Sequence, residues 1–305
     1  MPYHAPLGYE PDVCLYHHPC ADGFTAAWAV QLRWPNCKML PAAYKEGAAL
    51  PDVAGKHVLI VDFSYKPDPT MQIVAEAASV TILDHHVSAQ RLLEPLIQDG
   101  TINGVFDMTK SGAMLAWEFC FGDQPGVAAV WDLNDDEGAP ALVRYVQDRD
   151  LWTWELPDAK AICAWMGLTP MDFDSWTNMA QVLDDFDGFH YAKSVGGALV
   201  KKQEADISGA IKASKRRMTI GGYDVPVANL PYIFASDAGA ILCKGEPFSA
   251  TYFDTADEYR SFSLRSDKND PNAVDVSEIA AQFGGGGHRS AAGFRVYLGF
   301  EGDVN

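Results

Sequence analysis

Three short apolar segments of the sequence end in acidic or imidazole side chains. In chain order these side chains are His17, Asp22, Asp62, Asp84, His85 and His86. Carboxylate oxygens and imidazole nitrogens are donors with which proteins hold Mn²⁺, Mg²⁺, Fe²⁺ or Zn²⁺. Two such ions about 3.5–4 Å apart can clamp a phosphate and activate water near neutral pH. The residue types therefore predict a metal site for phosphate chemistry.

Each of these residues, taken singly, has a simpler explanation. An isolated Asp after a strand more often caps a turn or a helix than binds a metal. Several such strand ends in one parallel sheet favour the metal site, because the loops after those ends lie together. Asp62 stands alone after the run HVLIV, so we expect it to bridge two ions. We expect Asp84 to orient a neighbouring ring or backbone N–H.

Strand-like and helix-like patterns alternate over the first half of the chain. The expected strands are Val13–His18, Lys38–Tyr44, His57–Ser64, Val80–His85 and Thr101–Asp107. The expected helices between them are Phe24–Arg33, Pro67–Ala78 and Ser111–Phe121. This alternation predicts βαβ units, a parallel sheet and an α/β fold.

The second half changes from helices to strands. Helical patterns fill residues 139–215 and include Pro140–Asp148, Ala159–Met166 and Phe189–Lys215. Strands are expected over Met218–Leu230 and Phe248–Ser266, and Gly221-Gly222 is expected to form a hairpin turn. Short helices are expected over Ser236–Lys244 and Asp275–Phe283. We predict a metal-binding domain over 1–190, a helical linker over 191–215 and a smaller α/β domain over 216–305. The active site is expected in the cleft between the two domains.

The composition limits the class of partner. The 305 residues carry a net charge of -18, whereas proteins that grip long nucleic acids usually present a basic face. A long duplex is therefore disfavoured, although the acidity also serves solubility. The sequence has no apolar run of the ~18–20 residues that cross a membrane, no secretory signal pattern and no C-x-x-C pair. We expect a cytoplasmic protein with no membrane partner. Its expected ligand is a short nucleotide or a phosphorylated small molecule, and a homodimer is compatible with the sequence.

Five motifs, in this order, resemble those of the DHH phosphoesterase superfamily. They are Y-H-H-P-C-A-D-G-F (16–24), V-D-F-S (61–64), D-H-H (84–86), Q-D-R-D-L-W (147–152) and G-G-G-G-H-R-S-A-A-G-F (284–294). The last motif resembles that of the DHH-associated C-terminal domain. Within the superfamily, the chain resembles the branch with an H-x-x-C-x-D-G-F first motif, related to nanoRNases, pAp phosphatases and exopolyphosphatases. The resemblance implies a metal-dependent phosphoric ester hydrolase.

The resemblance also assigns roles to individual residues. It implies that the metal ligands are His17, Asp22, Asp62, His85 and Asp148, with Asp150 as the alternative to Asp148. It places Asp62 between two ions and His86 near the scissile phosphate, so His86, Asp62 and Asp84 form the expected catalytic group. The expected cofactor is one or two divalent ions, first of all Mn²⁺, with Mg²⁺, Fe²⁺ and Zn²⁺ as alternatives.

The first motif departs from the family pattern H-x-x-x-D-x-D. By strict count Tyr16 occupies the family's His position and Cys20 stands where the first Asp belongs, although a different loop would let His17 reach the metal. A thiolate is a soft ligand, whereas Mn²⁺ and Mg²⁺ prefer oxygen. Three interpretations stay open: the first metal position is weakened, it takes a softer ion such as Zn²⁺ or Fe²⁺, or Cys20 only packs under the loop.

The glycine-rich segment near the C-terminus is the expected substrate-binding element. Glycines let backbone N–H groups approach an anion, and an arginine adds a planar charged fork. We expect Gly285, Gly286, Gly287, His288 and Arg289 to hold an anionic end of the substrate. The simpler explanation of a glycine run is a flexible connection, which would also serve as a hinge.

The leading functional hypothesis is hydrolysis of short nucleotides by metal-activated water. The substrates considered are oligoribonucleotide ends, pAp-like bisphosphates and cyclic dinucleotides. Alternatives are an exopolyphosphatase or a RecJ-like single-strand exonuclease. A catalytically lapsed nucleotide-binding protein is a further alternative, because the first motif is altered.

Overall fold

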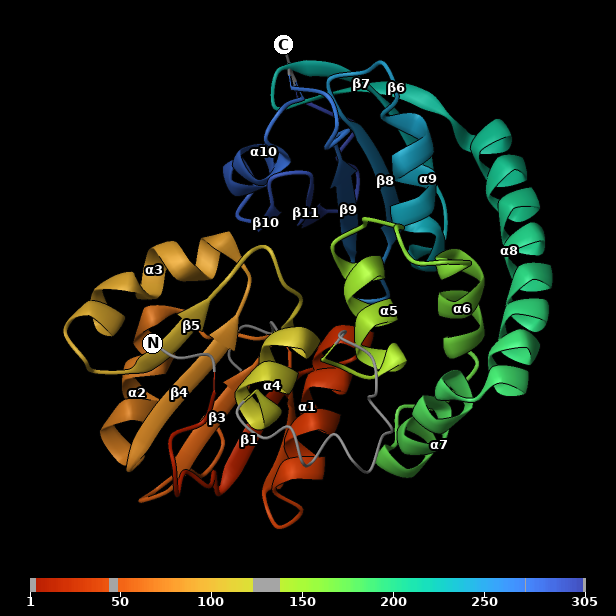
Figure 1. Cartoon of the computed structure of the whole chain (residues 1–305). Coiled ribbons are helices and arrows are strands. Elements are labelled where there is room, and N and C mark those ends of the chain that lie inside the picture. Colours follow the sequence, from red (N-terminus) through yellow and green to blue (C-terminus); the bar gives the residue numbers. More distant parts are fainter. Residues whose placement is uncertain (1–3, 44–48, 123–137, 272, 304–305) are drawn as a thin grey trace. The chain divides into compact units, whose positions relative to one another are not determined.

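The chain forms two compact units, Met1–Val200 and Lys201–Asn305, and each is described by itself. The computed structural model describes residues 4–43, 49–122, 138–271 and 273–303 (Figure 1). The division between the units falls within helix α8 (Phe186–Ser214), in the segment that the sequence predicts as a helical linker. Among the described residues, no helix combines the length and the apolar character needed to cross a bilayer.

The first unit contains a five-stranded parallel sheet with strand order β2-β1-β3-β4-β5. Its strands are β1 (Val13–His17), β2 (Lys38–Ala42), β3 (His57–Val61), β4 (Ser79–Asp84) and β5 (Asn103–Phe106). The prediction of an α/β fold with a parallel sheet is confirmed. Tyr44, at the end of the predicted strand Lys38–Tyr44, lies outside the described residues.

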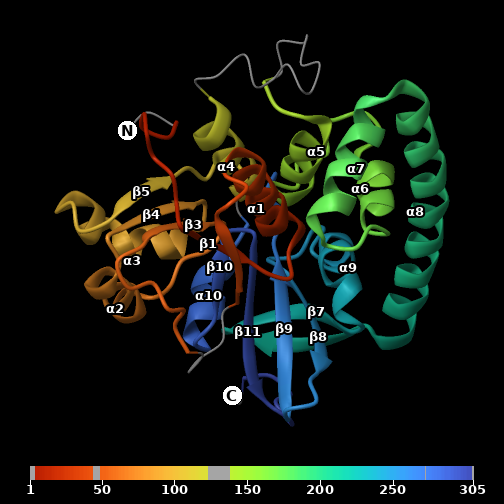
Figure 2. The same cartoon turned by 90° about the horizontal axis from the view of Figure 1, so that it is seen from below.

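Helices cover both faces of this sheet (Figures 1 and 2). They are α1 (Ala21–Arg33) and α4 (Gly112–Phe121) on one face, and α2 (Pro67–Glu76) and α3 (Val87–Gln98) on the other. Helix α5 (Ala141–Asp150) packs against α1 and α4, and α6 (Ala159–Met166) and α7 (Phe173–Asp184) pack against α5. Successive residues of a strand point to opposite faces. Cys14 and Tyr16 accordingly join the core around α1 and α4, whereas Val13 and Leu15 join the core under α2 and α3. A parallel sheet requires this cover on both faces, because both are apolar.

The helix α3 is absent from the sequence predictions. It begins at Val87, directly after His86, and only Leu93 among its residues is buried. It also contains Pro95, which is unusual in a helix interior because its ring removes a backbone donor. A mostly exposed helix with an internal proline gives a weak signal in the sequence.

The second unit contains a six-stranded mixed sheet with strand order β10-β11-β9-β8-β7-β6. Its elements are β6 (Arg216–Ile220), β7 (Tyr223–Asn229), η2 (Tyr232–Phe234), α9 (Ala235–Leu242), β8 (Ser249–Asp254), β9 (Tyr259–Arg265), α10 (Val276–Gln282), β10 (Gly286–His288) and β11 (Ala291–Tyr297). Gly221 and Gly222, both with positive φ, connect the antiparallel strands β6 and β7, so the predicted hairpin turn is confirmed. The antiparallel pair β10–β11 was not predicted.

Candidate metal centre

Three neighbouring strands of the parallel sheet end at the same edge. The register pairs Tyr16 of β1 with Val61 of β3, and Val61 with Leu83 of β4. The next residue along each strand is therefore His17, Asp62 or Asp84. Parallel pairing thus brings together side chains that lie far apart in the sequence, as expected from the strand ends.

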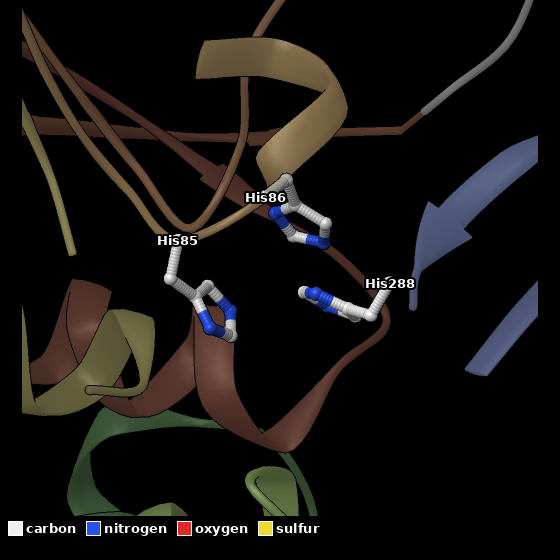
Figure 3. Close-up of side chains that lie close together, drawn as sticks. All are labelled: His85, His86 and His288. Carbon is white, nitrogen blue, oxygen red and sulfur yellow. The ribbon is translucent and has the colours of Figure 1, made fainter. Parts of the chain in front are cut away.

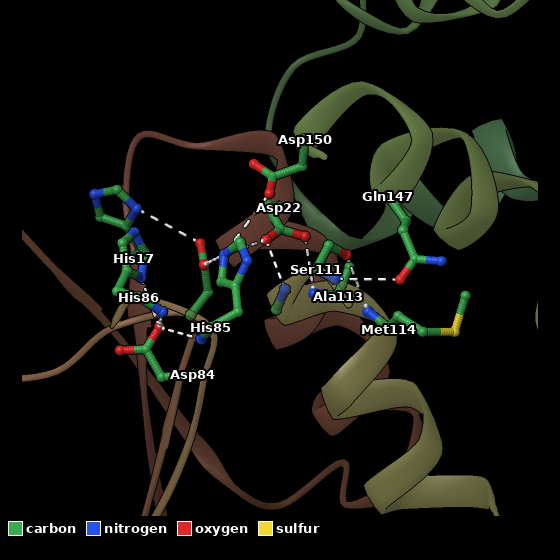
Figure 4. A network of polar contacts seen from close by, with 12 residues as sticks. His17, Asp22, Asp84, His85, His86, Ser111, Ala113, Met114, Gln147 and Asp150 are labelled. Carbon is green, nitrogen blue, oxygen red and sulfur yellow. Dashed lines mark hydrogen bonds and ion pairs between the residues drawn. The ribbon is translucent and has the colours of Figure 1, made fainter. Parts of the chain in front are cut away.

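The imidazole of His85 lies among three carboxylates. Its Nε2 atom is 3.1 Å from Asp62 Oδ1, 3.4 Å from Asp22 Oδ2 and 3.7 Å from Asp150 Oδ2. Asp22, Asp62 and His85 are buried, and Asp150 is partly exposed. Figure 4 shows Asp22 and Asp150 on the same side of the His85 ring. Donor atoms of Asp22, His85 and Asp150 all lie within 4.8 Å of one another, which suits a single cation.

Asp22, His85 and Asp150 are called the second group. The first group lies at the other carboxylate oxygen of Asp62. It comprises a ring nitrogen of His17, Sγ of Cys20 and a carboxylate oxygen of Asp62, all within 4.8 Å of one another. His17 Nδ1 is 3.5 Å from Asp62 Oδ2, whereas His85 Nε2 approaches Oδ1 of the same carboxylate. The two oxygens of Asp62 therefore face two separate donor groups, the arrangement that a carboxylate bridging two cations requires.

The start of α4 holds Asp22 in place. Its Oδ2 accepts a hydrogen bond from the backbone N–H of Gly112 (2.7 Å), and Oδ1 accepts one from Ala113 (2.8 Å). The first N–H groups of a helix have no partner within the helix and attract anions. Ser111 caps this helix through Oγ, and its own N–H donates to Gln147 Oε1 of α5 (Figure 4). These contacts fix Asp22 before any cation binds.

Two glycines allow the backbone to approach the centre closely. A Cβ atom at Gly112 would lie 2.4 Å from Asp62 Cβ, and one at Gly23 would lie 2.3 Å from the carbonyl oxygen of His17. Neither distance is compatible with a side chain unless neighbouring atoms move. Asp62 itself has a φ of 52°, a left-handed conformation that non-glycine residues adopt uncommonly. The close packing around Asp62 stabilises that conformation.

Asp84 orients the loop after β4. Its Oδ1 accepts hydrogen bonds from the backbone N–H of His85 (2.7 Å) and from His86 Nδ1 (2.6 Å), and its Oδ2 accepts one from Ser64 Oγ (2.5 Å). The structure therefore gives Asp84 the orienting contacts expected from the sequence. Figure 3 shows the His85 and His86 side chains at the end of the strand. The centroids of the two rings are 4.9 Å apart. Because Nδ1 of His86 faces Asp84, Nε2 is the ring atom directed away from it.

The electrostatics of the centre indicate an excess of buried negative charge. Burial and the neighbouring charges of Asp62 and Asp150 raise the pKa of Asp22 well above its ordinary value. Burial also raises the pKa of Asp150. Burial opposes charge on His85, but the hydrogen bond to Asp62 and the charges of Asp22 and Asp150 raise its pKa to about 10. Burial likewise opposes charge on Asp62, but its contacts with His17 and His85 outweigh burial and lower the pKa of Asp62.

These observations fit a site for divalent cations. The donors are carboxylates, imidazoles and one thiol, and three carboxylates surround a single imidazole. A buried carboxylate without a positive partner is unfavourable, and a metal ion supplies that charge. The residues present therefore match the donor sets that hold divalent ions.

The structure places the two carboxylates of the fourth motif in different surroundings, and the choice of ligand between Asp148 and Asp150 stays a prediction. The carboxylate of Asp148 accepts hydrogen bonds from Thr153 Oγ1 (2.5 Å) and from the N–H groups of Glu155 (2.8 Å) and Leu156 (3.3 Å). Asp150, the alternative in the same motif, approaches His85 instead. Asp148 thus stabilises the turn after α5, and Asp150 is the carboxylate at the centre.

The predicted substrate-binding segment forms part of the second sheet. Gly286, Gly287 and His288 form β10, and the backbone oxygen of Arg289 accepts a hydrogen bond from Val276 of α10 (2.8 Å). The glycines have a packing role here, because a Cβ atom at Gly285 would lie 2.1 Å from Gly293 O, and one at Gly287 would lie 2.6 Å from Ala292 Cα. Substrate binding by this segment stays a prediction.

Sequence reasoning missed several residues that shape the centre. Gly23 and Ser64 stand inside the quoted motifs, yet the motifs alone did not reveal their contacts. Gly112 and the capping residue Ser111 lie outside every motif. Their importance follows only from the approach of α4 to the strand ends.

Comparisons with known proteins give distant similarities. No family model matches the chain. The chain is 28% identical over 317 residues to an uncharacterized protein of Acanthamoeba polyphaga mimivirus, a match that covers 96% of this chain and 69% of that protein. It is similar to the solved structure of the pGpG-specific phosphodiesterase PggH from Vibrio cholerae, with a TM-score of 0.49, 12% identity and 94% of each chain covered. It is also similar to the solved DHH domain of a protein assigned to a family of ribosomal proteins, with a TM-score of 0.47, 14% identity, and coverage of 94% of this chain and 83% of that one.

Proposed function

We propose that this chain is a metal-dependent phosphoesterase of the DHH superfamily that hydrolyses short nucleotides. The observation that carries the proposal is the position of Asp62, whose two carboxylate oxygens face two separate groups of donors. The five sequence motifs support the same family, because His17, Asp22, Asp62 and His85 come from three of them and Asp150 from a fourth.

Each donor at the centre has a defined task in this proposal. Asp62 would lie between two cations, with His17 and Cys20 as the other residues that would hold the first and Asp22, His85 and Asp150 as those that would hold the second. Divalent ions bound there supply electrophilic activation of the phosphate ester and of the attacking water. The chain itself positions the donors. The N–H groups of α4 hold Asp22, and the contacts of Asp84 hold the backbone at His85.

His86 is the residue that we propose contacts the phosphate. Its Nδ1 contacts Asp84 Oδ1, so its Nε2 is the ring nitrogen on the side away from Asp84 and the one that we propose faces a substrate oxygen. Burial opposes charge on this ring, but the hydrogen bond and the negative charge of Asp84 raise the pKa of His86 above its ordinary value. A protonated His86 would donate a hydrogen bond to a phosphate oxygen and stabilise negative charge there.

The charge of the whole chain favours a small substrate. A net charge of -18 repels a long polyanion, whereas a short nucleotide needs only the cations and a few local donors. In the second unit, Gly285–Arg289 are the residues that we propose bind an anionic group of the substrate. Arg289 is exposed and offers a planar fork of donors for a phosphate or carboxylate.

The proposal is tested by removing and restoring the metal. Chelator-treated protein is expected to lose the ability to release mononucleotides from a dinucleotide and to recover it with Mn²⁺, Fe²⁺ or Zn²⁺. The substrate panel includes pAp, cyclic dinucleotides, polyphosphate and single-stranded DNA. Preferred turnover of polyphosphate or of long single strands would overturn the substrate class and leave the metal chemistry in place.

The proposed hydrolysis would be contradicted if the protein bound these nucleotides but hydrolysed none of them in the presence of Mn²⁺, Fe²⁺ or Zn²⁺. Retained turnover in Asp62→Asn would contradict the proposed centre. These two results are distinguished by measuring metal content and nucleotide binding in the same preparations.

A further inference from the structure

The first of the two donor groups contains a sulfur atom. Cys20 directly precedes α1, and its Sγ lies within 4.8 Å of a ring nitrogen of His17 and an oxygen of Asp62. The second group, with Asp22, His85 and Asp150, offers only oxygen and nitrogen. Asp62 belongs to the first group, and its Oδ1 lies 3.1 Å from His85 Nε2 of the second. Only the first group contains sulfur, so the two adjoining groups differ in donor chemistry.

Cys20 also differs from the other cysteines of the chain. Cys14, Cys37, Cys120 and Cys163 are buried in the hydrophobic core around α1 and α4, and Cys243 is buried in the second unit. Cys20 is half-buried and is a member of a polar cluster instead. A cysteine that only fills space would be expected among apolar side chains. Its surroundings therefore favour a role as a ligand over a role in packing.

We infer that the group of His17, Cys20 and Asp62 binds a borderline transition-metal ion, such as Zn²⁺, Co²⁺ or Fe²⁺, through a thiolate at Cys20. This inference rests on the proposed metal centre and specifies which ions its first position takes. Thiolates bind these ions strongly, whereas Mn²⁺ and Mg²⁺ favour oxygen donors. Binding forms a bond between the metal and Sγ, and the thiol proton passes to solvent.

The number of donors is consistent with a reactive rather than a purely structural position. Structural zinc sites use four protein ligands, whereas catalytic sites use three and leave a position for water or substrate. The first group supplies three, from His17, Cys20 and Asp62. The second group supplies carboxylates and an imidazole, which also suit Mn²⁺. The centre would then hold a softer ion beside a harder one.

Cobalt titration of the metal-free full-length chain tests this inference. Under a non-chelating reductant, Co²⁺ bound to a thiolate gives a near-ultraviolet sulfur-to-metal charge-transfer band, and Co²⁺ bound only to oxygen and nitrogen does not. We expect the band in the natural chain and its loss in Cys20→Ser and Cys20→Asp. Cys20→Asp should still bind Co²⁺ and should shift the Zn²⁺-to-Mn²⁺ affinity ratio toward Mn²⁺ by about tenfold or more.

A matched control separates this thiol from the others. Cys243→Ser changes a buried cysteine of the second unit whose Sγ faces the Ala240 carbonyl oxygen, a contact that a hydroxyl can also make. This variant should keep the band, and circular dichroism checks that all variants fold. Cobalt bound without the band, or a band that persists in Cys20→Ser, would overturn the inference while the metal centre stands. Failure of the natural chain to bind any divalent ion would overturn both the inference and the proposed function.

Discussion

The two sheets of this protein present polar side chains in different ways. In the parallel sheet of the first unit, the ends of β1, β3 and β4 bring His17, Asp62 and Asp84 together at one edge. In the mixed sheet of the second unit, β10 and β11 run antiparallel, and the candidate residues Gly286–His288 lie along a strand. The parallel strands of the first unit bring polar side chains together at one edge of the sheet. The antiparallel pair presents backbone groups along its length and a turn at its end. Under the proposed function, metal chemistry belongs to the first unit and substrate binding to the second.

The largest effect on metal affinity is expected at Asp62, the proposed bridging carboxylate. Its loss would test whether the first unit contains the metal centre. Asp62→Asn keeps the shape of the side chain, and Asn tolerates the left-handed backbone at this position. Loss of residues that only orient a ligand lowers metal affinity about 10–100-fold, so loss of a bridging ligand should lower it by at least about a hundredfold. Isothermal titration with Mn²⁺ and Zn²⁺ measures the change. Affinity equal to that of the natural chain would remove Asp62 from the centre.

Substitutions at Asp148 and Asp150 test which of the two carboxylates of the first unit is a metal ligand. Asp150→Ala should lower metal affinity by about tenfold or more, whereas Asp148→Ala should leave it unchanged. Asp148→Ala should instead lower the free energy of unfolding by about 1–3 kcal/mol, because the N–H groups of Glu155 and Leu156 lose their acceptor. Metal titration and chemical denaturation measure the two effects. Lower metal affinity in Asp148→Ala and unchanged affinity in Asp150→Ala would identify Asp148 as the ligand.

The pH dependence of Asp150→Ala provides a further check on that assignment. The folded pKa of Asp150 lies above its unfolded value, so ionisation of this carboxyl opposes folding. The opposition is absent below the unfolded pKa of about 4 and grows as the pH rises through the folded pKa. Metal-free Asp150→Ala should therefore gain stability relative to the natural chain near neutral pH and lose that gain in acid. Partial exposure of the side chain makes the gain small.

The glycine at the start of α4 tests whether packing holds the first unit's centre together. In Gly112→Ala the new methyl group would lie 2.4 Å from Asp62 Cβ. Overpacking of this kind costs about 1–3 kcal/mol of stability, and displacement of Asp62 should also weaken metal binding. Gly197→Ala in α8 is the control, because no atom lies within 4 Å of the added methyl group and alanine favours a helix by about 0.5–1 kcal/mol. Equal behaviour of the two variants in thermal unfolding would contradict the tight approach at Gly112.

The smallest effect is expected in the second unit. Arg289→Ala should raise KM by about tenfold, the value of one charge-assisted hydrogen bond, and leave metal affinity unchanged. Arg295→Ala is the matched control, because Arg295 is an exposed arginine of the same unit that pairs with Asp257 at 2.9 Å, and such surface pairs contribute little. Steady-state kinetics and metal titration distinguish the two. A change in metal affinity without a change in KM would contradict the proposed division of roles.

The strand ends of the first unit could be predicted because each carries a local signal. An apolar run followed by Asp or His marks Asp62 and Asp84-His85-His86 without knowledge of the rest of the fold. The spacing of the strands then predicts that these ends meet, and the structure brings their donor atoms close enough to share an ion.

The choice between Asp148 and Asp150 could not be made from the sequence in the same way. Both belong to α5, and two residues in a helix that are two positions apart point to nearly opposite sides. The rotation of that helix about its axis depends on packing against α4, α6 and α7. Gly112 is a similar case, because its role depends on the distance between α4 and the end of β3.

The anchoring of Asp22 by α4 has a consequence for reactivity. If Asp22 binds a cation as proposed, its carboxylate would share charge with two amide hydrogens and would donate less electron density to that cation. The strength of these amide contacts varies with the position of the whole helix. Trp117, farther along α4, donates from its indole to the backbone oxygen of Gly138, so the helix that positions Asp22 is itself anchored at a second point.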